Sequence, residues 1–327
     1  MGCVIPTHLH ITIIKLTLNP HTMNRHQLWL ITRYSFTEIW RNKTFRVAFM
    51  ILIPLIIAYQ LSFQSDMFNI PVEYTLVLPS FIPTQNAYLF NLLLVFPLAT
   101  IGFWVHKQKK YNTLEALFVH PQGNDTYSIG FIIGTIIAFM IMGSISLAIA
   151  GLINLFASPT AFRPLIYVFY LVTLFLPTIV FIVGITSFLA ARCFKNGAVT
   201  TLFMLVYLSV DILFLSTLYH GLFDPIGILL PYTFSDFTGM ANLPGFLLHR
   251  VTFLLLGLGF IMLAISGLPR IPNKTNGRQL AACSGILVLL AGIFTGFITY
   301  NHHAQVKSRH ILYESVYKKY NSPNKMN

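Results

Sequence analysis

Long apolar runs alternate with short polar segments along almost the whole chain. Crossing a bilayer as a helix takes about 20 mostly apolar residues at about 1.5 Å each. Seven runs reach that length, and they cover residues 46–63, 86–105, 128–155, 166–191, 197–218, 247–268 and 280–300. None shows the alternation over about ten residues that is typical of a barrel strand, and a backbone in lipid must pair its own polar groups. The pattern therefore predicts an all-α, polytopic membrane protein.

Composition agrees with this fold class, because only 9% of the 327 residues are charged and 55% are hydrophobic. The formal net charge of +12 raises the question of a nucleic-acid partner. The lysines and arginines lie in short turns between the apolar runs and form no basic face, so we expect no nucleic acid. Three separate cysteines without CxxC spacing, and tail histidines without an HExxH pattern, predict neither a disulfide framework nor a metal site.

The basic residues predict which side of the membrane each segment faces. They concentrate before the first run and in the turns after the second, fourth and sixth runs, and the positive-inside rule places these segments in the cytoplasm. The alternate loops, 64–85, 156–165 and 219–246, carry far fewer basic residues and are predicted to face outward. Seven spans then leave the tail after Tyr300 outside although it is basic, and a six-span core with a misplaced seventh helix stays open.

The chain before the first run divides into two parts. Residues 1–22 lack the basic start and the cleavage site of a signal peptide, and we interpret them as an extension that precedes a true start at Met23. Residues 26–42 place apolar side chains at roughly helical spacing. This segment is predicted to be an interfacial helix on the inner membrane surface, or equally a cytoplasmic extension of the first span.

A short amphipathic helix is predicted between the second and third runs. Asn112 is positioned to cap it, Glu115 follows three residues later, and a proline and a glycine end it. One side of this helix carries Leu114, Leu117 and Phe118. A helix of about two turns is marginal in water, so its apolar side needs the bilayer, the spans or another protein as a partner.

Two ionisable residues lie within the apolar runs. Asp211 is the only acid deep in a run, and such a residue is a functional candidate by default. An equally good interpretation is a neutral, structural side chain that contacts Ser209 or a tyrosine hydroxyl at a dimer interface. Arg250, near the predicted outer boundary, either extends outward to water or pairs with an acid.

Small residues at four-residue spacing occur in two of the runs. Gly130 and Gly134 lie in the third run, and Gly292 and Gly296 lie in the seventh. Such pairs permit close approach of two helices, so we interpret both as packing positions.

The order of these elements resembles that of the permease subunits of ABC-2 type transporters. Over about residues 23–270 the chain has, in order, an amphipathic helix, two spans, a short cytoplasmic helix of the form Thr-Leu-Glu-x-Leu followed by a proline, and four further spans. Asp224-Pro225-Ile226-Gly227 resembles that family's Asp-Pro-Phe-Gly turn, and His249-Arg250 resembles its Asn-Arg pair. The residues Ile226 and His249 depart from the family pattern, so any direct role of these side chains does not carry over.

The resemblance implies a division of the chain and a set of partners. An interfacial helix at 23–45 would precede a six-span permease domain at 46–270, with a seventh span at 271–300 and a tail at 301–327. A separate ATPase subunit would dock on the short helix, and the implied contact residues are Thr113, Leu114, Glu115, Leu117 and Phe118. The chain has no GxxxxGK[ST] motif, so the expected ATP hydrolysis belongs to that partner, and this chain needs no cofactor or catalytic residue of its own. The implied motif positions are Asp224, Gly227, His249 and Arg250.

The same resemblance implies a setting. It places the protein in a bacterial inner membrane, where it works with a second permease subunit as a homodimer or heterodimer. The segment YESVYKKYNSP in the tail resembles the linker that leads to an extracytoplasmic zinc aminopeptidase in permease–peptidase fusion proteins. A membrane anchor for such a peptidase is therefore one alternative function.

Two further functions stay open. A secondary transporter with Asp211 as proton or sodium carrier would be expected to show inverted repeats and broken spans, and no convincing repeat is visible. An intramembrane enzyme would need several converging polar residues, which the sequence does not reveal.

Overall fold

The computed structural model describes residues 25–64, 79–94, 101–102, 124–157, 161–215, 221–227, 234–235, 239–240, 242–267 and 277–320. The predicted extension at 1–22 and the short helix that contains Thr113, Leu114, Glu115, Leu117 and Phe118 lie outside these residues.

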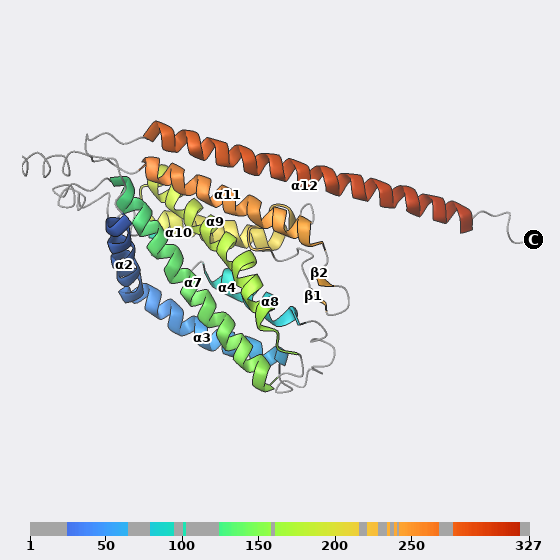
Figure 1. Ribbon diagram of the computed structural model, residues 1–327, viewed down its shortest axis with the longest axis horizontal. Coiled ribbons are helices and arrows are strands. Elements are labelled where there is room, and N and C mark those ends of the chain that lie inside the picture. The colour runs from blue at the N-terminus through green and yellow to red at the C-terminus, as the bar shows by residue number, and fades with distance from the viewer. Residues whose placement is uncertain are drawn as a thin grey trace, which may run out of the picture.

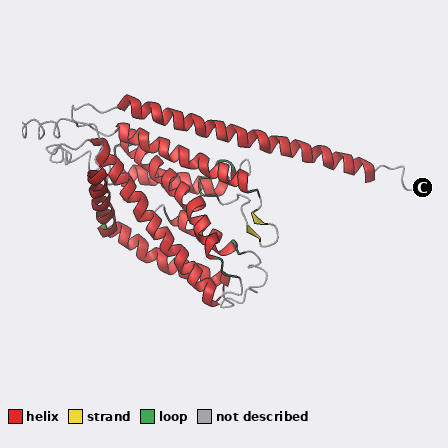
Figure 2. Ribbon diagram, viewed as in Figure 1, coloured by secondary structure: helices red, strands yellow, loops and turns green. Residues whose placement is uncertain are grey.

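Helices make up nearly all of the described chain, with one short β-hairpin (Figures 1 and 2). The first are α2 (Arg25–Arg41), α3 (Lys43–Gln64), α4 (Phe81–Leu93) and α7 (Asn124–Ala157). One long rod is divided into α8 (Pro164–Tyr170), the π-helix η3 (Leu171–Phe175), α9 (Leu176–Phe188) and the π-helix η4 (Leu189–Cys193). Next come α10 (Gly197–Val210), the π-helix η5 (Asp211–Leu215), and the strands β1 (Phe234–Ser235) and β2 (Gly239–Met240), which pair antiparallel. The last two helices are α11 (Leu243–Gly267) and α12 (Gly277–Tyr320).

The predicted fold class is confirmed by these helices. In the described part of the chain, five helical segments are long and apolar enough to cross a membrane, namely Lys43–Ser62, Thr126–Phe156, Pro164–Cys193, Leu243–Ser266 and Ala281–Lys319. Helix α10 is apolar but shorter, and α4 has 13 described residues. The protein is thus an all-α membrane protein with several spans, while the count of seven stays a prediction.

The bundle has two opposite ends (Figure 1). Helix α2 lies at one end, where α7 and α12 begin, and we call this the α2 end. The β-hairpin lies at the opposite end, where α11 begins, and we call this the hairpin end. Ser80, just before α4, ties the hairpin to the bundle, since its hydroxyl oxygen accepts from the Phe234 N–H at 2.9 Å.

Helix α2 docks on the start of α7. It is a separate helix, because Asn42 interrupts the chain after it and accepts from the Thr44 N–H at 2.9 Å, which caps α3. The glycines of α7 make close packing possible: a Cβ on Gly130 would lie 2.7 Å from Ile31 Cγ2, and one on Gly134 would lie 2.8 Å from the Thr32 carbonyl oxygen. The packing predicted for this glycine pair is confirmed, and the membrane-surface position of α2 stays a prediction.

Helices α9 and α11 cross at an even closer distance. A Cβ on Gly257 of α11 would lie 2.6 Å from the Phe181 Cα atom of α9, and a Cβ on Gly184 would collide with the Gly257 carbonyl oxygen. Two glycines therefore allow the two backbones to touch in the centre of the bundle.

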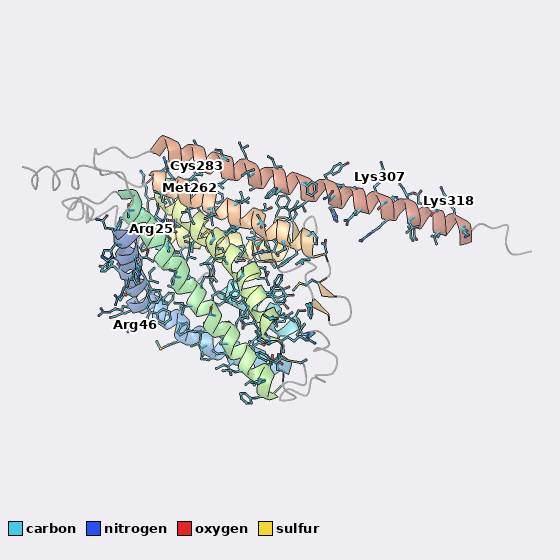
Figure 3. The ribbon with its side chains drawn as sticks, in the orientation of Figure 1. Arg25, Arg46, Met262, Cys283, Lys307 and Lys318 are labelled. Carbon is cyan, nitrogen blue, oxygen red and sulfur yellow. The ribbon has the colours of Figure 1, made fainter. Side chains whose placement is uncertain are left out.

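Helix α12 runs beside α11 and continues past the predicted end of the last span at residue 300 (Figure 1). Its 44 residues extend over about 66 Å at ~1.5 Å per residue, about twice the hydrocarbon thickness of a bilayer. No described atom lies within 4 Å of a Cβ built on Gly292 or Gly296, so the packing predicted for this pair is not found within the described chain. Basic residues occur both at the α2 end, with Arg25 and Arg46, and on the projecting part of α12, with Lys307 and Lys318 (Figure 3).

Candidate functional site

The structure brings together the polar residues that the sequence singled out in and beside the late spans. Asp211 begins η5, Asp224 and Gly227 lie in the loop at 221–227, and His249 and Arg250 lie two turns into α11. Each of the four polar side chains is at most 2% exposed. Three separate stretches of sequence therefore contribute to one buried cluster on the hairpin side of the bundle, which we call the Asp224–Arg250 cluster.

The loop at 221–227 has a fold that its sequence requires. One carboxylate oxygen of Asp224 accepts from the backbone N–H groups of Ile226 and Gly227, both at 2.8 Å, and the Asp224 N–H donates to the Gly221 carbonyl at 3.1 Å. Gly221 and Gly227 both have φ of 81°, a left-handed conformation that favours glycine. The Asp-Pro-Ile-Gly turn is thus a self-capped Asx turn with glycine where the backbone needs it.

The rod that contains α9 has a break in its helical hydrogen bonding, and this break provides acceptors for Arg250. Pro177 has no N–H, so the carbonyl of Thr173, four residues earlier, has no α-helical donor. The rod widens into the π-helix η3 at this point, where the Leu176 N–H donates to the Leu171 carbonyl. The Nε atom of Arg250 donates to the orphan Thr173 carbonyl at 3.1 Å.

The rest of the guanidinium joins this rod to the loop. Nη2 donates to the Leu174 carbonyl at 3.1 Å and to the Thr178 hydroxyl, and Nη1 donates to the Pro225 carbonyl at 3.0 Å. The Thr178 hydroxyl also donates to Pro225 at 3.0 Å. Arg250 points inward and is fully buried, so the alternative of an outward, water-seeking side chain is wrong. Five donors in a rigid fork suit this task better than an ammonium group would.

The neighbouring His249 fixes the other side of the loop. Its Nε2 lies 3.0 Å from the Gly221 carbonyl and 3.1 Å from the Leu222 carbonyl. Both partners are acceptors, so we assign the hydrogen to Nε2, and Nδ1 of the neutral ring is then an acceptor. Nδ1 is buried and has no hydrogen-bond partner among the described residues.

Asp211 lies next to Asp224 on the remaining side. Its carboxyl group lies close to that of Asp224 and interacts with it electrostatically, and both of its oxygens are buried. Asp224 in turn interacts with Arg250. Ser209 or a tyrosine hydroxyl was predicted to contact Asp211. The Ser209 hydroxyl donates instead to the Leu205 carbonyl, whereas the Tyr207 phenol lies within electrostatic range of Asp211.

The cluster has the chemistry of a structural junction. A carboxylate, a guanidinium and an imidazole fix a loop onto α9 and α11, and nearly all of their groups are occupied by backbone atoms. No group of three or more His, Cys, Asp or Glu side chains that is suited to a metal ion occurs among the described residues. The hydrogen bonds of the cluster therefore join the loop at 221–227 to η3, α9 and α11.

A second polar cluster, of amides, was missed from the sequence. The side-chain N–H groups of Gln64 donate to Gln60 at 2.6 Å, and those of Asn86 donate to the Ser146 hydroxyl at 2.7 Å. All four side chains, on α3, α4 and α7, are at most 1% exposed, as is Asn91, whose amide has no partner among the described residues. The sequence signal for this cluster is the four-residue spacing of two glutamines in an apolar run, which places both on one helix face. A prediction based on ionisable residues alone does not include it.

Comparisons with known proteins add no assignment to this geometry. The sequence matches no protein-family model, and no curated protein matches it at a significant level.

Proposed function

We propose that this protein is a membrane permease subunit of the ABC-2 type, which moves a substrate when a separate ATPase subunit drives it. The observation that carries the proposal is the Asp224–Arg250 cluster. The motif positions Asp224, Gly227, His249 and Arg250 come from two stretches of sequence, and they form one unit that joins a loop to α9 and α11. Such a unit gives these helices a common movement at the hairpin end, as a rigid-body mechanism requires.

Helix α7 is the element that would carry the movement between the two ends. It begins at Asn124, shortly after the predicted ATPase-docking helix, and its 34 residues run to the hairpin end. It packs against α2, α3, α4 and α9. A displacement of the docking helix would therefore act directly on a helix that contacts four others in the described part of the chain, and α9 would pass it to Arg250.

The first prediction concerns ATPase association. Glu115→Lys and Phe118→Ala are expected to abolish co-purification of an ATPase subunit co-expressed from the neighbouring genes, because they reverse a charge and remove the apolar anchor of the predicted docking helix. The measurement is the amount of ATPase that is retained by the affinity-tagged permease in detergent, together with its ATP hydrolysis rate.

Two exposed residues of α12 provide matched controls, Glu314→Lys and Tyr317→Ala. Both side chains lie on the projecting part of α12, at 54% exposure, and do not belong to the predicted docking segment. These variants should retain the ATPase at the wild-type level. If no ATPase associates with the wild-type chain, or if all four variants behave alike, the permease proposal fails.

A secondary transporter is the second candidate, and the burial of Asp211 beside another carboxyl group favours it. Such a pair can bind and release a proton within the membrane. Under the permease proposal Asp211 is structural, so Asp211→Asn, which preserves shape, should leave both ATPase association and proton permeability unchanged. Proteoliposomes that contain a pH-sensitive dye and experience an imposed potential report proton flux directly. Flux that is present in the wild type and lost in Asp211→Asn would overturn the permease proposal in favour of proton-driven transport.

A further inference from the structure

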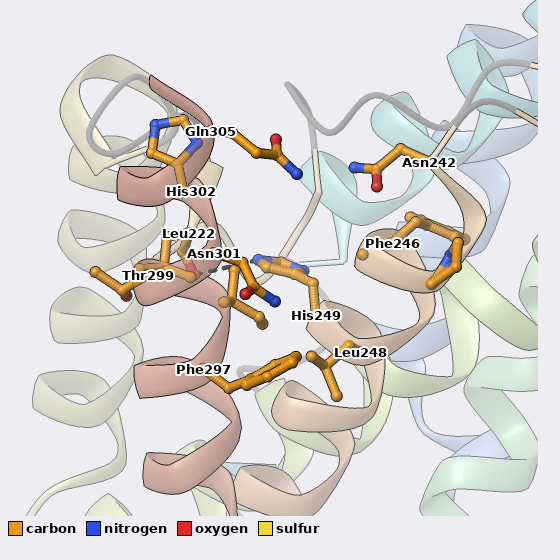
Figure 4. A pocket seen from close by; sticks show the side chains of 13 residues that line it. Leu222, Asn242, Phe246, Leu248, His249, Phe297, Thr299, Asn301, His302 and Gln305 are labelled. Carbon is orange, nitrogen blue, oxygen red and sulfur yellow. Dashed lines mark hydrogen bonds between the residues drawn. The ribbon is translucent and has the colours of Figure 1, made fainter. Parts of the chain in front are cut away.

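A cavity of about 500 Å³ lies at the turn between α2 and α3, and its volume is within the range of small-molecule sites. The end of α2 and the first two turns of α3 line it, and Arg46 lies at this turn (Figure 3). We call it the α2–α3 cavity. The cavity between α11 and α12 differs in character, because its described lining includes the amides of Asn242, Asn301 and Gln305 but no lysine or arginine (Figure 4). Charge therefore distinguishes the α2–α3 cavity.

Aromatic side chains form one wall of the α2–α3 cavity. The Trp40 ring packs against Phe45 and Phe49, with ring centroids 5.6 and 5.8 Å apart. Phe45 is 1% exposed, and its ring packs edge-on against Phe139 of α7 at 5.7 Å. Because α7 holds this wall in place, the cavity offers a fixed apolar surface that suits a hydrocarbon chain.

Two cations border the cavity in positions that their own helix disfavours. Lys43 and Arg46 lie three residues apart in the first turn of α3, and both are exposed. The positive end of the helix dipole disfavours cations in this turn, and like charges at this spacing repel each other. The sequence of α3 has no acidic residue, and Glu38, the one acid of α2, does not line the cavity. A bound anion would relieve both unfavourable interactions.

The position of the cavity fits a molecule from the bilayer. The first apolar run begins at residue 46, and the lining residues Val47 and Met50 are 51% and 63% exposed, as expected of lipid-facing side chains. The apolar stems of Lys43 and Arg46 line the cavity, and long side chains of this kind extend their charged groups toward water. A ligand would therefore place an anionic group at the rim and a chain along the apolar wall.

We propose that the α2–α3 cavity binds an anionic phospholipid, whose phosphate lies between Lys43 and Arg46 and whose acyl chain lies against Trp40. A zwitterionic lipid would bring a further cation to this cationic rim, so the net negative charge is the selected feature. Anionic lipids of the cytoplasmic leaflet attract basic residues beside a span, which agrees with the side predicted for this segment. The proposal does not depend on the ABC-2 type assignment, because it involves only the turn between α2 and α3.

Trp40 provides the probe for the experiment, because it lines the cavity and the chain has only two other tryptophans, Trp29 and Trp104. The full chain with Trp29→Phe and Trp104→Phe is reconstituted in nanodiscs of phosphatidylcholine. Increasing fractions of dibrominated phosphatidylglycerol or dibrominated phosphatidylcholine are included, since bromine quenches indole fluorescence on contact. Half-maximal quenching is expected at an about tenfold lower mole fraction of the anionic lipid. Photoreactive forms of the two lipids, crosslinked to the wild-type chain and mapped to residues 40–50, test the same preference without any substitution.

Two double substitutions test the location. Lys43→Gln with Arg46→Gln should reduce the preference for phosphatidylglycerol from about tenfold to about twofold. Arg25→Gln with Arg33→Gln removes the same charge from exposed positions of α2 that do not line the cavity, and should retain the full preference. Both proteins must first show the melting temperature of the parent chain, so that a folding defect is not read as loss of binding.

Three outcomes would overturn the proposal. Equal quenching by the two brominated lipids would mean that any acyl chain fills the cavity without selection. An equal loss of preference in the two double variants would mean that the surface charge of the whole segment attracts the lipid, and not the α2–α3 cavity. Relief of quenching by millimolar glycerol phosphate would mean that a soluble phosphate, and not a lipid, is the ligand.

Discussion

Gly257→Ala is expected to separate α9 from α11 and to destabilise the protein by about 3 kcal/mol, near the upper end of overpacking effects. The added Cβ would lie 2.6 Å from the backbone N and Cα of Phe181 and 2.7 Å from the carbonyl carbon of Val180. These are backbone atoms in the middle of a helix, so no rotamer change can relieve the collision. Gly257→Leu should prevent assembly altogether. The measurement is the melting temperature of the purified protein, followed by size-exclusion chromatography after heating.

Gly285→Ala on α12 is the matched control for this effect. It places the same methyl group in the same kind of apolar helix, but no described atom lies within 4 Å of the new Cβ. Because alanine favours a helix over glycine by about 1 kcal/mol, this variant should melt at or slightly above the wild-type temperature. If the two variants melt together, then the close crossing of α9 and α11 does not contribute to stability.

The glycines illustrate how far the sequence could predict this fold. Spacing alone put Gly130 and Gly134 on one face of a helix, and Gly292 and Gly296 on one face of another. The first pair packs against α2, while no described atom lies within 4 Å of a Cβ built on either glycine of the second pair. A repeat of small residues indicates that close approach is possible, but the partner depends on the path of the chain between helices, which local periodicity does not contain. The crossing of Gly184 and Gly257 was missed because neither glycine has a small partner at four-residue spacing in its own run.

The polar residues give a complementary lesson. The sequence marked Arg250 as either outward-facing or paired with an acid, and the deciding fact was Pro177, more than 70 positions away. A proline in a span frees a carbonyl, but which donor reaches that carbonyl is settled only when α11 packs beside it. Similarly, Asp224 was predicted as a motif residue from family order, while its capping role follows from the local sequence of a proline and two flanking glycines. The sequence therefore predicts the local turn chemistry of Asp224, but it does not predict the contacts that Arg250 makes across the bundle.

The end of α12 could not be placed because its signals conflict. Hydrophobicity falls at Asn301, so the last span was predicted to stop at residue 300, yet the helix continues to Tyr320. The residues beyond 300 include alanine, glutamine, lysine and glutamate, which favour helix irrespective of membrane depth. Hydropathy indicates where a membrane ends, whereas helix propensity decides where a helix ends, and these two limits differ here.

Arg250→Met is expected to have the largest effect among single substitutions in the Asp224–Arg250 cluster. It removes every donor to Thr173, Leu174 and Pro225 that the guanidinium supplies, and leaves the buried carboxylate of Asp224 without its cation. Leaving buried carbonyl groups without donors costs roughly 1–3 kcal/mol each, so a loss of roughly 3–5 kcal/mol is expected, which corresponds to a fall of roughly 5–15 °C in melting temperature. Arg250→Lys should recover less than half of the loss, because a single ammonium group cannot reach acceptors on both the rod and the loop. Arg192→Met serves as the matched control, since Arg192 is exposed and its side chain donates to the Ser266 hydroxyl at 3.0 Å.

A double substitution separates the electrostatic part of this loss from the hydrogen bonds. Asp224→Asn retains an oxygen for the N–H groups of Ile226 and Gly227 and removes only the negative charge. In the Arg250→Met background it should therefore restore part of the stability, with a coupling of roughly 1–3 kcal/mol between the two positions. Strict additivity would mean that the two charges do not support each other, and that the loop is held by the carbonyl contacts of Arg250 and His249 alone. Recovery in the double variant would instead show that the electrostatic interaction between Asp224 and Arg250 helps to hold the loop on the rod.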